Sequence, residues 1–279
     1  MKKLLKLGKY MYIGLMLFFL YAPIAVLIVF SFNESRSRAR WTGFTLNWYA
    51  DLFTNPRIAD AVIVTFTVAA LSAFFAVIIG TTAAIGINRL SSKKRHIRIQ
   101  KKALLSFTQL SMSSPEIVLG VSMMVAFVFF IRLLSFGELG FYTLLLSHII
   151  FNVPYVVMSV LPRLRRLDER VYEAALDLGA TPWTAFFTTI MPQLKPGIIS
   201  AAMIAFTLSI DDVVVSTFTS GATTNLSLLI FSQARRGISP SINALSTIMF
   251  IVVMLLLYVV NAIDAKNRKN NENSKGVLE

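Results

Sequence analysis

The chain has 279 residues, of which 56% are apolar and only 15% are charged, and its mean hydropathy is +0.68. This composition excludes an ordinary soluble globular protein and predicts an all-α integral membrane protein. There are no cysteines, which excludes disulfides, thiolate catalysis and sulfur-ligated metals. The two histidines, His96 and His148, are too far apart in sequence to indicate a local metal site.

Six apolar stretches are long enough to cross a bilayer as helices, which takes about 20 residues. In chain order they cover residues 10–32, 59–88, 103–134, 141–161, 197–219 and 242–264. The third stretch is overlong, and Pro115 predicts a break within it. The first is too long for the core of a secretory leader, so we expect it to remain as a helix. The sequence therefore predicts a polytopic protein with six transmembrane helices.

Basic residues predict the orientation, because cytoplasmic segments that flank membrane helices are enriched in lysine and arginine. With the N-terminus inside, the inner segments hold 20 of the 27 basic residues. These segments are residues 1–9, 89–102, 162–196 and 265–279. The first external loop keeps Arg36, Arg38 and Arg40, but the total favours both termini in the cytoplasm. The net charge of +13 is therefore a topology signal and does not indicate nucleic-acid binding.

The chain divides into three predicted parts. Residues 1–58 form the first helix and an external loop, residues 59–264 form the main membrane domain, and residues 265–279 form a disordered cytoplasmic tail. The external loop contains several aromatic residues of the kind that settle at a membrane interface. They are Trp41, Phe44, Trp48 and Tyr49. Anchoring at the interface explains them, and docking of an external partner is the alternative.

Polar residues recur along the third and fourth apolar stretches. Glu116 follows Pro115 and either caps a helix start or lines a pathway. His148, Asn152 and Tyr155 share one helical face, which can meet a polar face of the fifth stretch. For His148, the alternative is a hydrogen-bonded interior histidine.

The long inner loop, residues 162–196, is patterned as two short amphipathic helices. Asp168 can cap the first, and Gly179 suits the left-handed position that ends it. Thr181 and Pro182 begin the second, whose apolar face carries Trp183, and Pro192 and Pro196 are expected to close it. Either the two helices pack under the membrane domain, or they dock into a groove of a separate cytoplasmic protein.

Asp211 and Asp212 stand side by side in the fifth apolar stretch. On insertion scales each such charge costs about 2.5 to 3.5 kcal/mol near a helix centre, so intramembrane acids usually face protein or an aqueous path. Thr207 and Asp211 lie on one partly polar face, and Asp212 lies about 100° round the helix. One acid can then line a pathway while the other meets a neighbouring helix. The alternative is an ion pair or a cap at a helix break.

The inner loop resembles the cytoplasmic signature of ABC importer permeases of the binding-protein-dependent type. Glu173, Ala174 and Ala175 are followed at the family spacing by Gly179 and, further on, by Pro192. Thr189 and Met191 depart from the Ile and Leu of the family pattern. The resemblance implies a type I ABC importer transmembrane fold, in which this loop, with Glu173 and Trp183, couples to an ATP-binding subunit.

Five further stretches resemble the permeases of spermidine/putrescine importers within that family. They lie at residues 32–36, 41–49, 114–118, 206–216 and 239–245. The resemblance implies polyamine uptake across a bacterial inner membrane by a subunit that is not itself an enzyme. Its implied partners are a second, homologous permease, two copies of an ATP-binding subunit and an external polyamine-binding protein.

No cofactor is expected in this chain, because it lacks a phosphate-binding loop and the partner ATPase would use the ATP and magnesium. Three alternatives stay open from the residues. The first is an ABC importer for another small solute. The second is an ion-coupled carrier in which Asp211, Asp212 and Glu116 bind protons or sodium. The third, a membrane-embedded enzyme, lacks a recognisable nucleophile and base.

Overall fold

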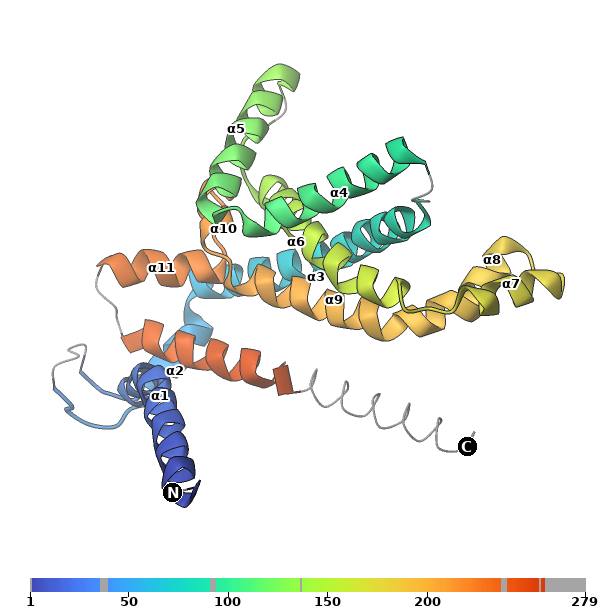
Figure 1. Cartoon of the computed structure of the whole chain (residues 1–279). Helices are drawn as coiled ribbons and strands as arrows, with labels where there is room; N and C mark the ends of the chain where they lie inside the picture. Colours follow the sequence, from blue (N-terminus) through green and yellow to red (C-terminus); the bar gives the residue numbers. More distant parts are fainter. Residues whose placement is uncertain are drawn as a thin grey trace. The chain divides into compact units, whose positions relative to one another are not determined.

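The computed structural model describes residues 2–35, 40–90, 94–135, 137–236, 240–255 and 257–258. Over these residues the chain is helical, with one isolated bridge between Asn33 and Phe44 and no β-strand (Figure 1). The chain clusters into two compact units. Unit 1 contains Met1–Ala59 and Leu229–Leu255, and unit 2 is made mainly of Asp60–Leu228.

Unit 1 contains α1 (Lys2–Phe30), α2 (Asn47–Thr54) and the apolar helical segment Pro240–Leu255. The loop between α1 and α2 is folded on itself. The Trp48 indole N–H donates to the Asn33 carbonyl at 2.8 Å. The Tyr49 hydroxyl lies 2.6 Å from Ser31 Oγ.

Two of the four aromatic residues, Trp48 and Tyr49, therefore form hydrogen bonds that stabilise the loop. Trp41 and Phe44 stay exposed. Interfacial anchoring, the expected role of these aromatics, remains a prediction. Arg36 and Arg38 lie outside the described residues.

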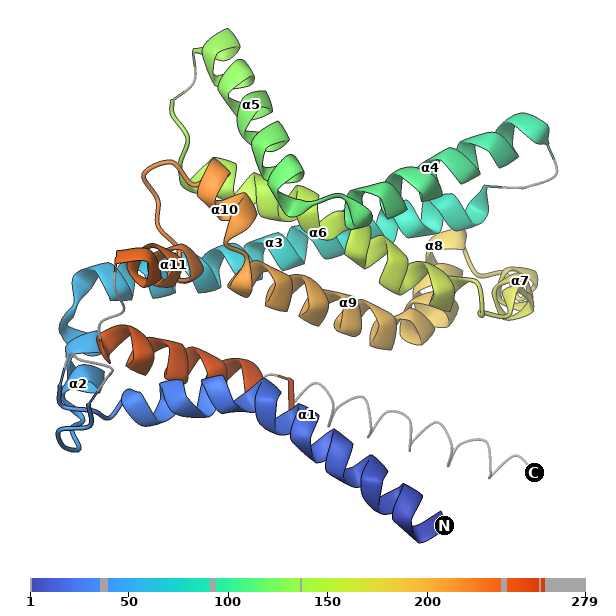
Figure 2. The same cartoon turned by 60° about the vertical axis from the view of Figure 1, so that its left-hand side comes forward.

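The remaining helices follow in chain order. They are α3 (Pro56–Arg89), α4 (Arg95–Ser113), α5 (Glu116–Leu134), α6 (Phe141–Leu164), α7 (Glu169–Asp177), α8 (Pro182–Ala185), the π-helical turn η1 (Phe186–Ile190), α9 (Met191–Asp211), α10 (Val214–Thr219) and α11 (Leu226–Arg236). Both views show α7 and α8 beyond the ends of α6 and α9 (Figures 1 and 2).

The core of unit 2 lies between α3, α6 and α9. Alanines dominate the sides of α3 and α9 that face α6, while α6 contributes valine and leucine. Small residues of this kind let membrane helices approach closely. The helices α3 and α6 approach closely at Gly80, where an added Cβ would lie 2.7 Å from Val156 Cβ. Gly80 is therefore required by packing between α3 and α6.

Five described helices are long and apolar enough to cross a membrane. They are Gly8–Phe30, Pro56–Arg89, Glu116–Leu134, Phe141–Leu164 and Pro182–Asp211. The sixth predicted span corresponds in part to the shorter helix Pro240–Leu255. Its predicted continuation and the tail at 265–279 lie outside the described residues. The count of six spans, the cytoplasmic termini and the division into three parts therefore stay predictions.

The predicted break at Pro115 is confirmed. Helix α4 ends at Ser113, and α5 begins at Glu116. The preceding helix starts at Arg95 and not at residue 103, because its first residues are polar and basic and so escape a search for apolar runs.

The prediction of a single helix over residues 197–219 is wrong. Helix α9 stops at Asp211, the backbone of Asp212 is extended with φ −63° and ψ 122°, and a separate helix, α10, follows. An aspartate side chain that bonds the following backbone amides competes with helix continuation, and β-branched valines resist it further. A cap at a helix break, the alternative that the sequence left open for the two aspartates, is what the structure shows at Asp212.

Pro192 and Pro196 do not close the second inner-loop helix, contrary to expectation. The helix is continuous from Pro182 to Asp211. A π-helical turn, Phe186–Ile190, precedes Pro192, and the Met191 N–H bonds the Phe186 carbonyl five residues back. The wider turn accommodates a proline ring that would otherwise meet the carbonyl four residues before it.

Replacing Gly80 by alanine tests the close approach of α3 and α6. Gly80→Ala should lower the free energy of unfolding by about 1–3 kcal/mol, because the new methyl group overpacks against Val156. Gly86→Ala is the matched control on the same helix, since its Cβ would meet nothing within 4 Å. Unfolding of the purified chain in detergent measures both. Equal stability of the two variants would show that Gly80 is not a packing requirement.

Candidate functional site

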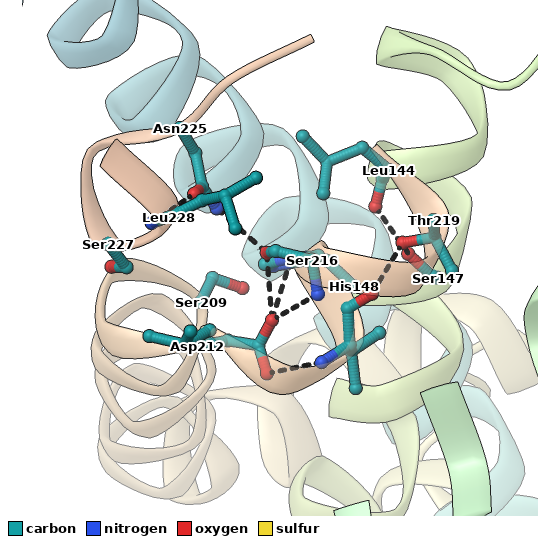
Figure 3. Close-up of polar contacts among 12 residues, drawn as sticks. Leu144, Ser147, His148, Ser209, Asp212, Ser216, Thr219, Asn225, Ser227 and Leu228 are labelled. Carbon is teal, nitrogen blue, oxygen red and sulfur yellow. Dashed lines mark hydrogen bonds and ion pairs between the residues drawn. The ribbon is translucent and has the colours of Figure 1, made fainter. Parts of the chain in front are cut away.

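The helix break places Asp212 at the start of α10, where its carboxylate bonds the first turn. Asp212 Oδ1 accepts from the Val215 N–H at 3.2 Å. Asp212 Oδ2 accepts from both the N–H and the hydroxyl of Ser216, each at 2.8 Å (Figure 3). The first amides of a helix have no partner within it, so the carboxylate satisfies donors that the break exposes.

Two further side chains complete this network. Asn225 Nδ2 donates to Ser216 Oγ at 2.7 Å, and His148 Nε2 lies 3.0 Å from the same oxygen and 3.5 Å from Asp212 Oδ2 (Figure 3). Ser216 has a single hydroxyl proton, which goes to Asp212. His148 Nε2 must therefore carry a proton and donate, while His148 Nδ1 has no partner in the described part of the chain.

Asp212 therefore caps α10, and His148 is a hydrogen-bonded interior histidine that supports this cap. Both side chains are buried. Their contact, at 3.5 Å, is the one contact between a basic and an acidic side chain found within the described residues. The hydrogen-bonded alternative proposed for each of them explains these contacts fully, and neither faces a surface that a solute could reach.

The predicted polar face of α6 does meet α9, through Asn152 as expected, but the partner on α9 is Ser209 and not the predicted face of Thr207 and Asp211. Asn152 Nδ2 donates to Ser209 Oγ at 2.8 Å, and Ser209 Oγ lies 2.8 Å from Ser72 Oγ on α3. These buried groups tie α3, α6 and α9 together. Hydrogen bonds of this kind help to hold membrane helices in register.

Sequence reasoning missed the partners in both networks. Ser72 is 137 residues from Ser209, and Asn225 follows α10 in a loop, so neither carries a local signal. Ser209 and Ser216 could have been found, because they stand three residues before and four residues after Asp212, a spacing that would place them on one face of a continuous helix.

Asp211, the neighbouring acid, has a different environment. It is exposed on the chain, at the end of α9, and its negative charge is repelled by those of Asp212 and, more weakly, of Glu116 on α5. Glu116 is exposed too and interacts with the partly buried Tyr155 of α6. Thr207 lies one turn before Asp211 and is partly buried. We call Glu116, Tyr155 and Asp211 the acidic cluster.

The acidic cluster has unneutralised negative charge. Neither Asp211 nor Glu116 forms an ion pair with a basic residue in the described ranges. Those ranges hold no group of three His, Cys, Asp or Glu side chains that could bind a metal ion. The cluster can therefore attract a cation that carries its own hydrogen-bond donors.

The predicted caps of the inner-loop helices are confirmed. Asp168 accepts from the Arg170 N–H at 3.0 Å, and Gly179 adopts φ +86°. Thr181 accepts from the Thr184 N–H at 3.3 Å, and Pro182 takes the first helical position.

The apolar side of these helices is not covered by the chain itself. Trp183 is 74% exposed and stacks on the 52% exposed Phe187, with ring centroids 5.8 Å apart. On the neighbouring helix α7, Glu173 and Ala174 are exposed, and Ala175 is partly buried. Exposed aromatic surface of this size marks an interaction site. We call the surface formed by Glu173, Trp183 and Phe187 the inner-loop surface.

An apolar helical bundle with a charged cluster between helices and an uncovered aromatic surface at one end defines a membrane-embedded transport subunit. Residues 77–267 match the family described as "Binding-protein-dependent transport system inner membrane component". The chain belongs to this family.

The relatives agree with this membership. The chain is 40% identical over 241 residues to the spermidine/putrescine transport system permease protein PotC of Escherichia coli, covering 86% of this chain and 87% of the relative. It is 38% identical to the PotC protein of Haemophilus influenzae, covering 89% and 93%. The predicted resemblance to this group of permeases is confirmed.

The fold matches solved ABC transporters. A chain of a bacterial ABC transporter involved in the import of the acidic polysaccharide alginate superposes with a TM-score of 0.70 at 18% identity, covering 96% of each chain. The expected type I importer fold is therefore confirmed.

Truncating each aspartate separates their roles. Asp212→Ala should lower the free energy of unfolding by about 1–3 kcal/mol, because it leaves the donors of Val215 and Ser216 unsatisfied. The exposed Asp211→Ala should change it by less than about 0.5 kcal/mol. Denaturant titration of the purified chain in detergent measures both. Comparable losses in the two variants would contradict the capping role of Asp212.

Proposed function

We propose that this chain is one of two permease subunits in an ATP-driven importer of polyamines, located in a bacterial inner membrane. The observation that carries the proposal is the acidic cluster, in which Glu116 and Asp211 stand unneutralised on membrane-spanning helices. Polyamines are flexible polycations whose ammonium groups donate hydrogen bonds to carboxylates. The named function of the PotC relatives supports the same cargo.

The acidic cluster is exposed on a single chain, and this exposure supports the presence of a second permease subunit that covers it. A charge facing lipid near a helix centre costs about 2.5 to 3.5 kcal/mol, and two such acids would cost more. A homologous permease packed against this face would remove the carboxylates from lipid and enclose a hydrated pathway between the subunits. This chain then supplies half of that pathway, with Thr207 near the acids.

The inner-loop surface supports docking of an ATP-binding subunit. Trp183 and Phe187 offer an aromatic anchor, and Glu173 offers a charge that makes no ion pair within the described residues. Two copies of the ATP-binding subunit, one for each permease, would use ATP and magnesium. The family is that of a membrane component, so hydrolysis falls to these partners. An external polyamine-binding protein would deliver the cargo.

One continuous helix connects the docking surface to the acidic cluster. It runs for 30 residues, Pro182–Asp211, from Trp183 at one end to Asp211 at the other. At 1.5 Å per residue such a helix is about 45 Å long. Movement imposed on Trp183 by the ATP-binding subunit would reach Asp211 as a nearly rigid displacement. The pathway could thus alternate between inward and outward openings.

Polyamine uptake tests the acidic cluster. Asp211→Asn should lower spermidine uptake about tenfold, which corresponds to about 1.4 kcal/mol of lost interaction. The complex should still assemble, because asparagine keeps the size of aspartate and can still form hydrogen bonds. Glu138→Gln, an exposed acid in the loop between α5 and α6, is the control. Radiolabelled spermidine uptake into cells with matched protein levels measures the effect. Normal uptake by Asp211→Asn would remove this residue from the pathway.

Charge reversal tests the inner-loop surface. Glu173→Lys should abolish co-purification of the ATP-binding subunit and reduce uptake, because it places a positive charge beside the docking aromatics. Glu138→Lys should leave both unchanged, since it makes the same reversal away from this surface. Intact ATPase binding in Glu173→Lys would disprove the coupling role.

A further inference from the structure

An apolar pocket of about 720 Å³ lies between α3 and the helix that runs from α8 into α9. Ile78 and Ile85 line it from α3, and Phe186, Met191 and Ile198 line it from the opposite helix. The pocket contains no residue of the acidic cluster, and it shares only Trp183 with the inner-loop surface. Ile78 is half exposed, so the pocket opens onto the side of a helix that is long enough to span the bilayer.

Polar residues interrupt the apolar lining at Thr81, Thr82, Arg89 and Tyr172, and two of them bear on what the pocket can bind. Thr81 is 8% exposed, and its hydroxyl has no hydrogen-bond partner in the described part of the chain. The adjacent Thr82 differs, because its hydroxyl donates to the Ile78 carbonyl of its own helix. An unsatisfied buried hydroxyl costs about 1–3 kcal/mol, so Thr81 offers a donor for which an occupant of the pocket would supply the acceptor. The second polar group is the guanidinium of Arg89, which is exposed at the end of α3.

The spacing of these two groups suits an amphiphile. They are eight residues apart on one helix, which is about 12 Å along its axis. Helical side chains tilt toward the N-terminus, so the long arginine side chain shortens the gap to Thr81. Helix α3 has 34 residues and is about 51 Å long, which exceeds a hydrocarbon core of about 30 Å. Its Arg89 end can therefore reach the headgroup region while the rest of the pocket stays in the apolar layer.

We propose that this pocket binds an anionic phospholipid. The lipid phosphate pairs with Arg89, an ester carbonyl accepts from the Thr81 hydroxyl, and an acyl chain lies against Ile78, Ile85 and Ile198. Lys101, which does not line the pocket, adds positive charge just beyond the end of α3, because its Nζ lies 3.2 Å from the Leu90 carbonyl. Basic pockets between membrane helices are known to select anionic headgroups.

The charge at the rim distinguishes this occupant from a protein side chain. An apolar anchor from another subunit would fill the isoleucine-lined part but would leave Arg89 and Thr81 without partners. A phospholipid satisfies all three parts of the pocket at once. The site also touches Phe186 at the π-helical turn, so a bound lipid would contact the helix that joins the inner-loop surface to the acidic cluster.

Native mass spectrometry of the full-length chain tests the proposal. The chain would be released from nanodiscs containing equal amounts of phosphatidylglycerol and phosphatidylcholine, and the retained lipids counted. Phosphatidylglycerol should be retained in preference. Arg89→Gln should weaken that preference about fivefold, in line with about 1 kcal/mol for each basic residue near a lipid headgroup. Arg98→Gln, an exposed basic residue on α4 outside the pocket, is the matched control. Thr81→Val should reduce retention of both lipids without changing the preference.

Two results would overturn the proposal. One is an equal loss in Arg89→Gln and Arg98→Gln, which would mean that the basic surface attracts lipid without a site. The other is a photoreactive amino acid at Ile78 that, in the assembled transporter, cross-links to another subunit and not to lipid. Neither measurement involves uptake, so the lipid site stands or falls independently of the polyamine proposal.

Discussion

A membrane helix that stops within an apolar stretch leaves backbone amides and carbonyls without partners, and hydrocarbon offers no water to satisfy them. At the junction of α9 and α10 the Asp212 carboxylate solves this problem by bonding two backbone amides and one hydroxyl. His148 from α6 and Asn225 from before α11 hold the same Ser216 oxygen, so the break is tied to its neighbours. The position of Asp211, and with it the acidic cluster, depends on where this capped break ends α9.

Asp211 and Asp212 therefore have different roles, because the helix ends between them. In a continuous helix they would lie about 100° apart and both would project sideways. The turn at Asp212 sends one carboxylate inward to the cap and leaves the other on the surface near Glu116. The cost of the buried charge is offset by three hydrogen bonds, while the exposed charge remains available. A transporter of the acidic polysaccharide alginate shares this fold at 18% identity, so the fold alone does not determine which solute is carried.

Much of the fold follows from the sequence alone, and the failures share a physical cause. Most of the apolar helices and the Pro115 break were predicted correctly, and so were the caps at Asp168, Gly179 and Thr181, because each depends on residues adjacent in the chain. The fate of Pro192 was not predicted, since a π-helical turn has no distinct sequence pattern and absorbs a proline that normally ends a helix. The capping role of Asp212 depends on His148 and Asn225, and the contact with Ser72 joins α3 to α9. Such long-range pairings have no sequence signal in a single chain.

The π-helical turn at Phe186–Ile190 also determines how far the side chains at one end of the helix from Pro182 to Asp211 are rotated about its axis relative to those at the other end. One additional residue in a turn rotates everything downstream by about 100° relative to an uninterrupted α-helix. Trp183 and Asp211 thus point in directions fixed by a single inserted residue near the cytoplasmic loop. Deleting one residue from this turn would leave both ends of the helix and almost all of its length unchanged. The deletion would nevertheless rotate Asp211 away from Glu116. The π-helical turn, a local irregularity in the helix, therefore sets the direction of the acidic cluster relative to the inner-loop surface.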